Sequence, residues 1–243
     1  MPSSMASSLQ CTPTSTTTTL TFATSGVTVG TLTDMALSTA IASAIDSACS
    51  PPPTATNGAF TCDENAVVTV SPSIQYVSND GDKHWDDKGS LTLQFKVGAY
   101  DSLVWYETAK GILAAAVSNS TQGNCKQLTA DGVSAAENYE PTAQTFTNCK
   151  AASFWQLSTS DSNPDPSGSG DVTPANEFAF DLGFVVDPDA DFSCKFVEDI
   201  VEFLETTVNA ATDTEAAIPG ELKIDDELLK ACEGATNSRV KKV

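Results

Sequence analysis

Alternating apolar and polar positions predict two β-strands in the first hundred residues. The first run covers Leu20 to Ala23 and resumes as Val27 to Val29, which predicts one strand with a bulge or bend at Gly26. The second run, Ser90 to Ala99, is the clearest strand in the sequence. Every second residue along it should face the core, namely Leu91, Leu93, Phe95 and Val97. This alternation is typical of a sheet with one packed face and one wet face.

A third run is rich in valine but contains a proline. Ala66 to Val77 has the composition of a strand, and Pro72 within it cannot donate a hydrogen bond to a neighbouring strand. We therefore expect this strand to lie at the edge of a sheet or to break at Pro72. By contrast, Thr121 to Phe146 is polar and lacks a repeating pattern, which predicts a long irregular connection.

Two stretches carry apolar residues at helical spacing. The first helix should begin after Thr31, a good N-cap, and end at Cys49, because the prolines that follow cannot continue it. Its apolar stripe consists of Leu37, Ile41, Ala44, Ile45 and Ala48. The second helix covers about Ser102 to Ser118, and its stripe consists of Trp105, Ala109, Ile112, Leu113 and Ala116. Two such helices can bury both stripes against one face of an antiparallel sheet.

Residues 18–160 therefore predict an α+β fold, an antiparallel sheet with helices packed on one face in the order βαββα. This order resembles the ferredoxin-like (split βαβ) topologies. It also looks like the SEA-type modules that occur in secreted and surface proteins. The resemblance rests on the order of the elements and on no motif, so it fixes no function.

The C-terminal part predicts a β-α-α extension that packs on the module or forms a half-repeat of it. Two helices, at about 192–210 and 221–232, should follow a strand at Glu177 to Val186. In that strand the apolar positions are Phe178, Phe180, Leu182 and Phe184. The expected organisation is a Ser/Thr-rich arm at 1–18, the module at 19–160, a linker at 161–175, the extension at 176–236 and a basic tail at 237–243.

The chain is strongly acidic. Its 243 residues include 32 Asp and Glu against 12 Lys and Arg, which gives a formal net charge of −20. Nucleic acid is excluded as a partner because binding phosphates needs many more cations. Membrane insertion is not expected either, since no apolar run is long enough to cross a bilayer and an anionic surface would repel the chain. An acidic surface suits solubility, cation binding or a basic partner.

Seven cysteines are distributed along the chain. Among the many possible connectivities, the spacing favours three sequential disulfides, Cys49–Cys62, Cys125–Cys149 and Cys194–Cys232. Cys11 is left over in the N-terminal arm, either as a free thiol or bonded to another chain. Disulfides indicate an oxidising compartment. With one His and no C-x-x-C pair, a zinc site is not expected.

The expected location is extracellular or at the cell surface. The sequon Asn119-Ser120-Thr121 agrees with secretion and predicts glycosylation at Asn119. The Ser/Thr-rich arm is either O-glycosylated or disordered. Met1 to Gln10 lacks the basic and apolar regions of a signal peptide. Either the mature form is shown, or export uses another route, or the protein stays inside.

Two acidic loops contain the oxygen ligands that Ca²⁺ prefers, and we expect no other cofactor. The first loop contains Asp80, Asp82 and Asp86, but ordinary turn chemistry is the favoured explanation of its sequence. The second contains Asp187, Asp189 and Asp191 at the spacing of an EF-hand loop. There Phe192 replaces the glycine that the sharp turn needs, so capping of the following helix is favoured.

No nucleophile motif, phosphate-binding loop or singled-out acid–base pair indicates an enzyme. The leading hypothesis is a non-enzymatic extracellular structural or interaction protein, a subunit of a larger filament, coat or shell. Its partner would be another copy of itself or another protein. The alternative is a secreted monomeric cysteine-rich binding protein of effector or lectin type, which would take a glycan or another partner. A hydrolase that uses two carboxylates is the third hypothesis.

Overall fold

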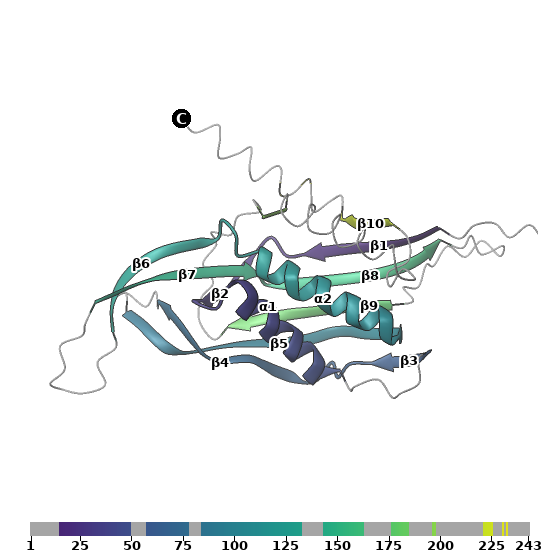
Figure 1. Ribbon diagram of the computed structural model, residues 1–243, viewed down its shortest axis with the longest axis horizontal. Helices are drawn as coiled ribbons and strands as arrows, with labels where there is room; N and C mark the ends of the chain where they lie inside the picture. The colour runs from purple at the N-terminus through teal and green to yellow at the C-terminus, as the bar shows by residue number, and fades with distance from the viewer. Residues whose placement is uncertain are drawn as a thin grey trace, which may run out of the picture.

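The computed structural model describes residues 15–49, 57–77, 84–132, 143–162, 176–184, 196–197, 221–225, 230 and 232. Their elements follow in the order β1 (Ser15–Phe22), β2 (Gly26–Gly30), α1 (Asp34–Ala48), β3 (Asn57–Thr61), β4 (Val67–Val77), β5 (His84–Ser102), α2 (Leu103–Asn119), β6 (Cys125–Gly132), β7 (Gln144–Ala152), β8 (Phe154–Ser162), β9 (Asn176–Phe184) and β10 (Glu221–Ile224). The two helices lie side by side across one face of the sheets (Figure 1). The predicted α+β class with helices on one face is confirmed.

The described strands form one sheet of seven and one of three. In the larger sheet the order is β10–β1–β8–β9–β5, and β4 and β3 pair with successive parts of the long strand β5 on its other side. The smaller sheet has the order β6–β7–β2. A short parallel pairing of β5 with β6 joins the two sheets, where His84 lies opposite Asp131 and Trp85 opposite Gly132. The ferredoxin-like order is not shown by this arrangement.

One pair of strands runs through both sheets and bends between them. β1 pairs with β8 in the larger sheet, and their continuations β2 and β7 pair in the smaller one. At the bend, the amide of Ala23 donates to the carbonyl of Phe154 (3.0 Å), and that of Ser153 donates to the carbonyl of Ser25 (3.0 Å). The predicted single strand around Gly26 is therefore two strands in two sheets. The change of direction falls at Ala23 to Ser25, where both partners turn together.

Three other strand predictions need correction. The stretch from Thr121 to Phe146, expected to be irregular, contains β6 and the start of β7, which pair antiparallel. The start of the predicted final helix is β10, which runs parallel to β1. The strand assigned to a C-terminal extension is β9, which lies in the middle of the larger sheet between β8 and β5. These pairings join residues far apart in sequence, which local patterns do not report.

Both helices form where their apolar stripes predicted. Every residue of the two predicted stripes is buried. Ser102 caps α2, because its hydroxyl oxygen accepts a hydrogen bond from the amide of Trp105 (3.2 Å). The N-cap of α1 is Thr33, two residues later than the predicted Thr31, and its side chain makes no capping bond. The tail of the second helix meets the start of the first, since the hydroxyl of Ser118 donates to the carbonyl of Asp34 (2.8 Å).

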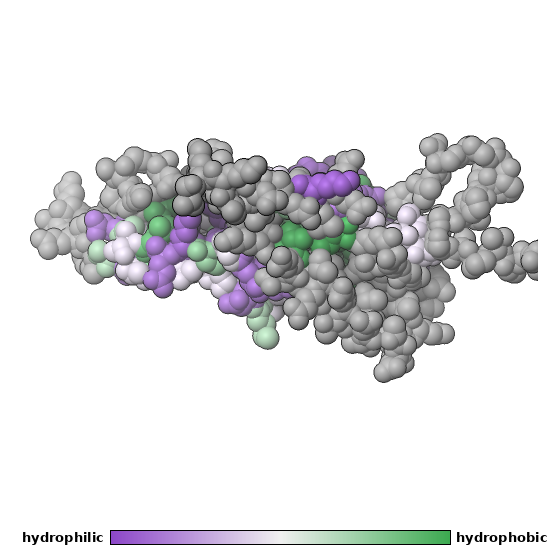
Figure 2. Space-filling model, turned by 90° about the horizontal axis from the view of Figure 1, so that it is seen from above, coloured by the Kyte–Doolittle hydropathy of each residue, from purple (hydrophilic) through white to green (hydrophobic). Residues whose placement is uncertain are grey.

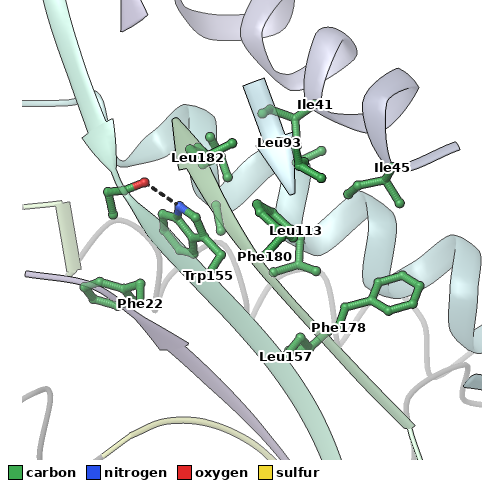
Figure 3. Packing of buried hydrophobic residues seen from close by; sticks show 14 of the residues in the cluster. Phe22, Ile41, Ile45, Leu93, Leu113, Trp155, Leu157, Phe178, Phe180 and Leu182 are labelled. Carbon is green, nitrogen blue, oxygen red and sulfur yellow. Dashed lines mark hydrogen bonds between the residues drawn. The ribbon is translucent and has the colours of Figure 1, made fainter. Parts of the chain in front are cut away.

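Aromatic and aliphatic side chains together form the core beneath the helices (Figure 3). Trp155 is fully buried, and its indole nitrogen donates to the carbonyl of Ala152 (3.0 Å). The ring of Phe22 contacts those of Trp155 and Phe196, with ring centroids 5.3 and 5.1 Å away. The alternation predicted for β9 is confirmed, with Phe178, Phe180 and Leu182 buried.

A bulge in β5 changes which of its residues face the core. Leu91, Leu93 and Phe95 are buried as predicted, but the register with β9 shifts between Phe95 and Val97. Val97 is therefore only partly buried, and Gly98 and Tyr100 take the inward positions. A Cβ atom on Gly98 would lie 2.5 Å from the Cβ of Cys62, so the first disulfide needs a glycine here.

Two disulfides join residues that lie opposite each other on antiparallel segments. Cys49–Cys62 spans an isolated β-bridge, and Cys125–Cys149 joins paired residues of β6 and β7. They are two of the three predicted pairs, and they fit an oxidising compartment. Cys232 is also disulfide-bonded, to a cysteine outside the described residues. Cys194, its predicted partner, and Cys11 lie outside them as well.

Candidate interaction edge

Strand β4 lies at the border of the larger sheet. It pairs with β5 along one side, and no other described strand pairs with it (Figure 1). Its register with β5 shifts between Thr69 and Ser71, between Ser71 and Ile74, which is the interval that contains Pro72, and between Ile74 and Tyr76. The prediction from Pro72 is confirmed, because the strand is an edge and its pairing is also interrupted at the proline.

The C-terminal half of β4 is covered by the smaller sheet. The amide of Thr31, just after β2, donates to the carbonyl of Gln75 (3.1 Å). The side-chain amide of Gln75 donates to that of Gln144 at the start of β7 (3.3 Å). Together with the pairings of β4 to β5, β5 to β6, β6 to β7 and β7 to β2, this contact closes a ring of strands. The part of β4 that no described strand covers on this side is thus Val67 to Ser71, which we call the β4 edge.

The β4 edge is apolar and uncharged. Val67 is 61% exposed, and Thr69 is exposed beside it on the same side of the strand. Val68 and Val70 point the other way and are partly buried against the core. No charged residue occurs from Ala66 to Val77, although the whole chain carries a formal charge of −20. By contrast, the side that is uppermost in Figure 1 mixes strongly hydrophilic residues with apolar patches (Figure 2).

A group of polar side chains joins the two helices. The carboxylate of Asp46 on α1 accepts hydrogen bonds from the hydroxyl of Tyr106 (2.6 Å) and the ammonium group of Lys110 (2.8 Å), both on α2. Lys110 also pairs with Glu107 one turn earlier (2.7 Å), and its ammonium lies 5.0 Å from the centre of the Tyr106 ring. We call these four residues the helix-pair cluster. Its partners are mutually satisfied, so it is an attachment between helices.

Burial and hydrogen bonding change proton affinities in the helix-pair cluster. Burial, reinforced by the hydrogen bond to Asp46, raises the pKa of Tyr106 far above its ordinary value. For Lys110, burial lowers the pKa, but hydrogen bonds to Asp46 and Glu107 outweigh it and the net pKa is raised. Both groups therefore hold their protons more tightly in the folded chain than in the unfolded chain.

We expect alkaline pH to weaken the protein through Tyr106. Because its folded-state pKa is raised, the unfolded chain loses this proton above about pH 10 while the folded chain keeps it. The free energy of unfolding therefore falls as pH rises above that value. A Tyr106→Phe variant should lose about 1 kcal/mol at pH 7 and show a shallower fall between about pH 10 and 12. Urea unfolding at a series of pH values measures both, and parallel pH profiles would contradict this role of Tyr106.

The predicted cation sites fall mostly outside the described residues. Asp187, Asp189 and Asp191 lie there, as do Asp80 and Asp82. Asp86 was expected in a loop but belongs to β5, opposite Tyr76 of β4. Within the described part of the chain, no three His, Cys, Asp or Glu side chains come together in a way that could hold a metal ion. Calcium binding by either acidic loop stays a prediction.

The amino-acid sequence predicted the β4 edge but not the helix-pair cluster. The proline in a valine-rich run indicated the β4 edge. The helix-pair cluster joins Asp46 to Lys110, which are 64 residues apart, and no local pattern connects them.

None of the described helices has the length and apolar character needed to cross a membrane. No protein-family model, curated protein or solved structure matches the chain.

Proposed function

We propose that this chain is a non-enzymatic extracellular structural protein that assembles with copies of itself through the β4 edge. The observation that carries the proposal is the open, uncharged stretch from Val67 to Ser71 on an otherwise acidic protein. An exposed apolar edge strand is a template for pairing with another strand, and monomeric proteins usually protect such edges with charges. Here the stretch carries no charge, and only the register shift between Thr69 and Ser71 and the proline that follows, Pro72, interrupt it.

The charge distribution favours a second copy as the partner. Two chains with a net charge of −20 repel each other unless the surfaces that meet carry little charge. The β4 edge satisfies this condition, because the nearest charged residues on its N-terminal side are Asp63 and Glu64. A strongly basic partner would gain little from docking at an uncharged edge. An identical edge gains most, since it brings valines together without opposing charges.

Antiparallel pairing of two β4 edges about a two-fold axis is geometrically simple. Centred on Thr69, it would place Val68 opposite the partner's Val70 and Val67 opposite the partner's Ser71. Glu64 would then face the partner's Ile74, so no carboxylates would lie opposite each other. The contact would extend the larger sheet across both copies and cover Val68 and Val70, which are only partly buried in the single chain.

The extracellular part of the proposal is supported by the disulfides and the sequon. Cross-links such as Cys49–Cys62 and Cys125–Cys149 persist in oxidising compartments. Residues 15–18 of the predicted Ser/Thr-rich arm belong to β1, while the rest of that arm, Cys11 and the basic tail lie outside the described residues. They remain part of the proposal as additional contacts between copies.

Placing a lysine on the β4 edge should prevent assembly. A Thr69→Lys variant would set two ammonium groups against each other at the two-fold axis, so we expect self-association to weaken about tenfold or more. Thr147→Lys is the matched control, because Thr147 is also an exposed threonine and lies on β7, the strand between β6 and β2. Light scattering over a range of concentrations, with and without reductant, measures the mass of each variant.

The measured masses distinguish assembly through the β4 edge from assembly through a disulfide and from a monomer. The β4 edge is supported if the wild-type chain and Thr147→Lys have a mass greater than that of one chain. The mass of Thr69→Lys should then lie closer to that of one chain. A wild-type mass that falls only on reduction would assign assembly to a disulfide between chains and overturn the edge. A monomer at every concentration would also overturn the proposal and favour the secreted binding protein.

A further inference from the structure

The sequon at the end of α2 is built into the fold in a way that restricts its chemistry. Asn119 is the last residue of the helix, and Ser120, its C-cap, is helical with φ −63° and ψ −15°. Ser120 is 0% exposed and Thr121 is 3% exposed, whereas Asn119 itself is only partly buried. The acceptor residue therefore reaches the surface while the two residues that follow it do not.

Both hydroxyl groups of this segment are engaged in the folded chain. The Thr121 hydroxyl donates to the carbonyl of Ser118 (2.8 Å). The Ser120 hydroxyl donates to the carbonyl of Val117 (2.7 Å), and its oxygen accepts a hydrogen bond from the amide of Ala152 on β7 (3.2 Å). An enzyme that recognises the Thr hydroxyl of Asn-x-Thr would have to break these contacts and pull the segment out of the protein.

The residues that follow the sequon are also attached to β7. The side-chain amide of Asn124 donates to the carbonyl of Ser120 (2.8 Å), and the carbonyl of Asn124 accepts from the amide of Lys150 (3.1 Å). The next residue, Cys125, is linked to Cys149 of β7. Because β7 comes later in the chain, this attachment cannot form until residues 144–152 have been made and have paired.

We infer that Asn119 is an N-glycosylation acceptor that can be modified only before the chain folds, and that the folded protein retains the glycan but cannot acquire it. This rests on the secretory location in the proposed function. In the transfer, the side-chain nitrogen of Asn119 bonds to the anomeric carbon of an oligosaccharide carried by a lipid diphosphate. The bond from that carbon to the diphosphate breaks, the lipid diphosphate leaves with the electron pair, and the nitrogen gives one proton to a base of the transferase.

The glycan would be attached close to the start of α1. The start of α1 lies next to the sequon, because the Ser118 hydroxyl binds the Asp34 carbonyl. Met35, the neighbour of Asp34, is 82% exposed, the highest value among the large hydrophobic residues that the structure describes as exposed. A glycan on Asn119 would extend beside this methionine and shield it, which is a use for the modification on a surface protein.

The test compares folded and unfolded forms of the same full-length chain. Each is incubated with an oligosaccharyltransferase and a lipid-diphosphate-linked oligosaccharide, and intact mass spectrometry counts the added glycans. We expect the reduced, unfolded chain to be modified and the folded, oxidised chain to react at least about a hundredfold more slowly, as the small unfolded fraction of a stable protein implies. Asn119→Gln should not react in either form.

A variant far from the sequon makes the test sharper. Phe178→Ala leaves residues 119–121 unchanged but raises the unfolded population, so under native conditions its modification rate should rise about a hundredfold or more over folded wild type. A folded wild-type chain that reacts as fast as the unfolded one would overturn the inference. So would an unreactive unfolded chain, or a rate that Phe178→Ala leaves unchanged. None of these results depends on assembly, which Thr69→Lys tests separately.

Discussion

A Phe178→Ala variant should lose about 3–5 kcal/mol of its free energy of unfolding, the range for removing a fully buried phenylalanine. The side chain is 0% exposed, on a central strand of the larger sheet. Four other rings surround it, those of Trp105, Phe95, Tyr100 and Tyr106, with centroids 5.1, 5.4, 5.7 and 5.8 Å away. The loss exceeds the transfer of one ring because these edge contacts add to the energy of burial.

The same substitution on the other face of the sheet is the control. Phe154, on the neighbouring strand β8, is only partly buried and lies opposite Asp181. Phe154→Ala should therefore cost about 1 kcal/mol or less. Urea unfolding followed by tryptophan fluorescence measures both variants. Equal losses would mean that the aromatic cluster under the helices is not the centre of stability.

Local sequence patterns predicted the helices and strands whose buried face is visible as a short repeat of apolar residues. The stripes of α1 and α2 repeat every three or four residues, so the sequence displays the face that will be buried. Strand β9 displays its face in the same way, because Phe178, Phe180 and Leu182 alternate with polar or small residues. In both helices the opposite surface includes exposed residues, whereas in β9 the opposite face is buried at Ala179 and partly buried elsewhere.

The sheet topology was not predictable for physical reasons. Strands β6 and β7 are polar along much of their length, and they form because they pair with each other and with β2, not because each buries an apolar face. The bulge near Val97 lies in the pairing of β5 with β9, and the glycine after it, Gly98, leaves space for Cys62, so both features depend on partners distant in sequence. The β4 edge was anticipated from Pro72, but its length was not. That length is set by the contact between Thr31 and Gln75.

Gly30 controls this contact, and Gly30→Ala should cost about 2–5 kcal/mol. Its φ is +59°, a conformation that costs any residue with a Cβ about 1–2 kcal/mol. In addition, a Cβ would lie 2.1 Å from the carbonyl oxygen of Gln75 and 2.5 Å from the Cγ2 of Ile74. Overpacking against backbone that cannot move adds about 1–3 kcal/mol. The strand β2 would have to leave β4, which breaks the hydrogen bond from Thr31 to Gln75.

Gly111→Ala is the matched control and should change stability in the opposite direction. Gly111 lies in the middle of α2, is exposed, and would place its new Cβ in open space. Alanine favours the helix over the unfolded chain, so we expect a gain of about 0.4–1 kcal/mol. Urea unfolding separates the two variants, and a Gly30→Ala chain as stable as wild type would contradict the closed ring of strands. If the ring does open, the unpaired length of β4 grows, so Gly30→Ala should also assemble more readily than Gly111→Ala.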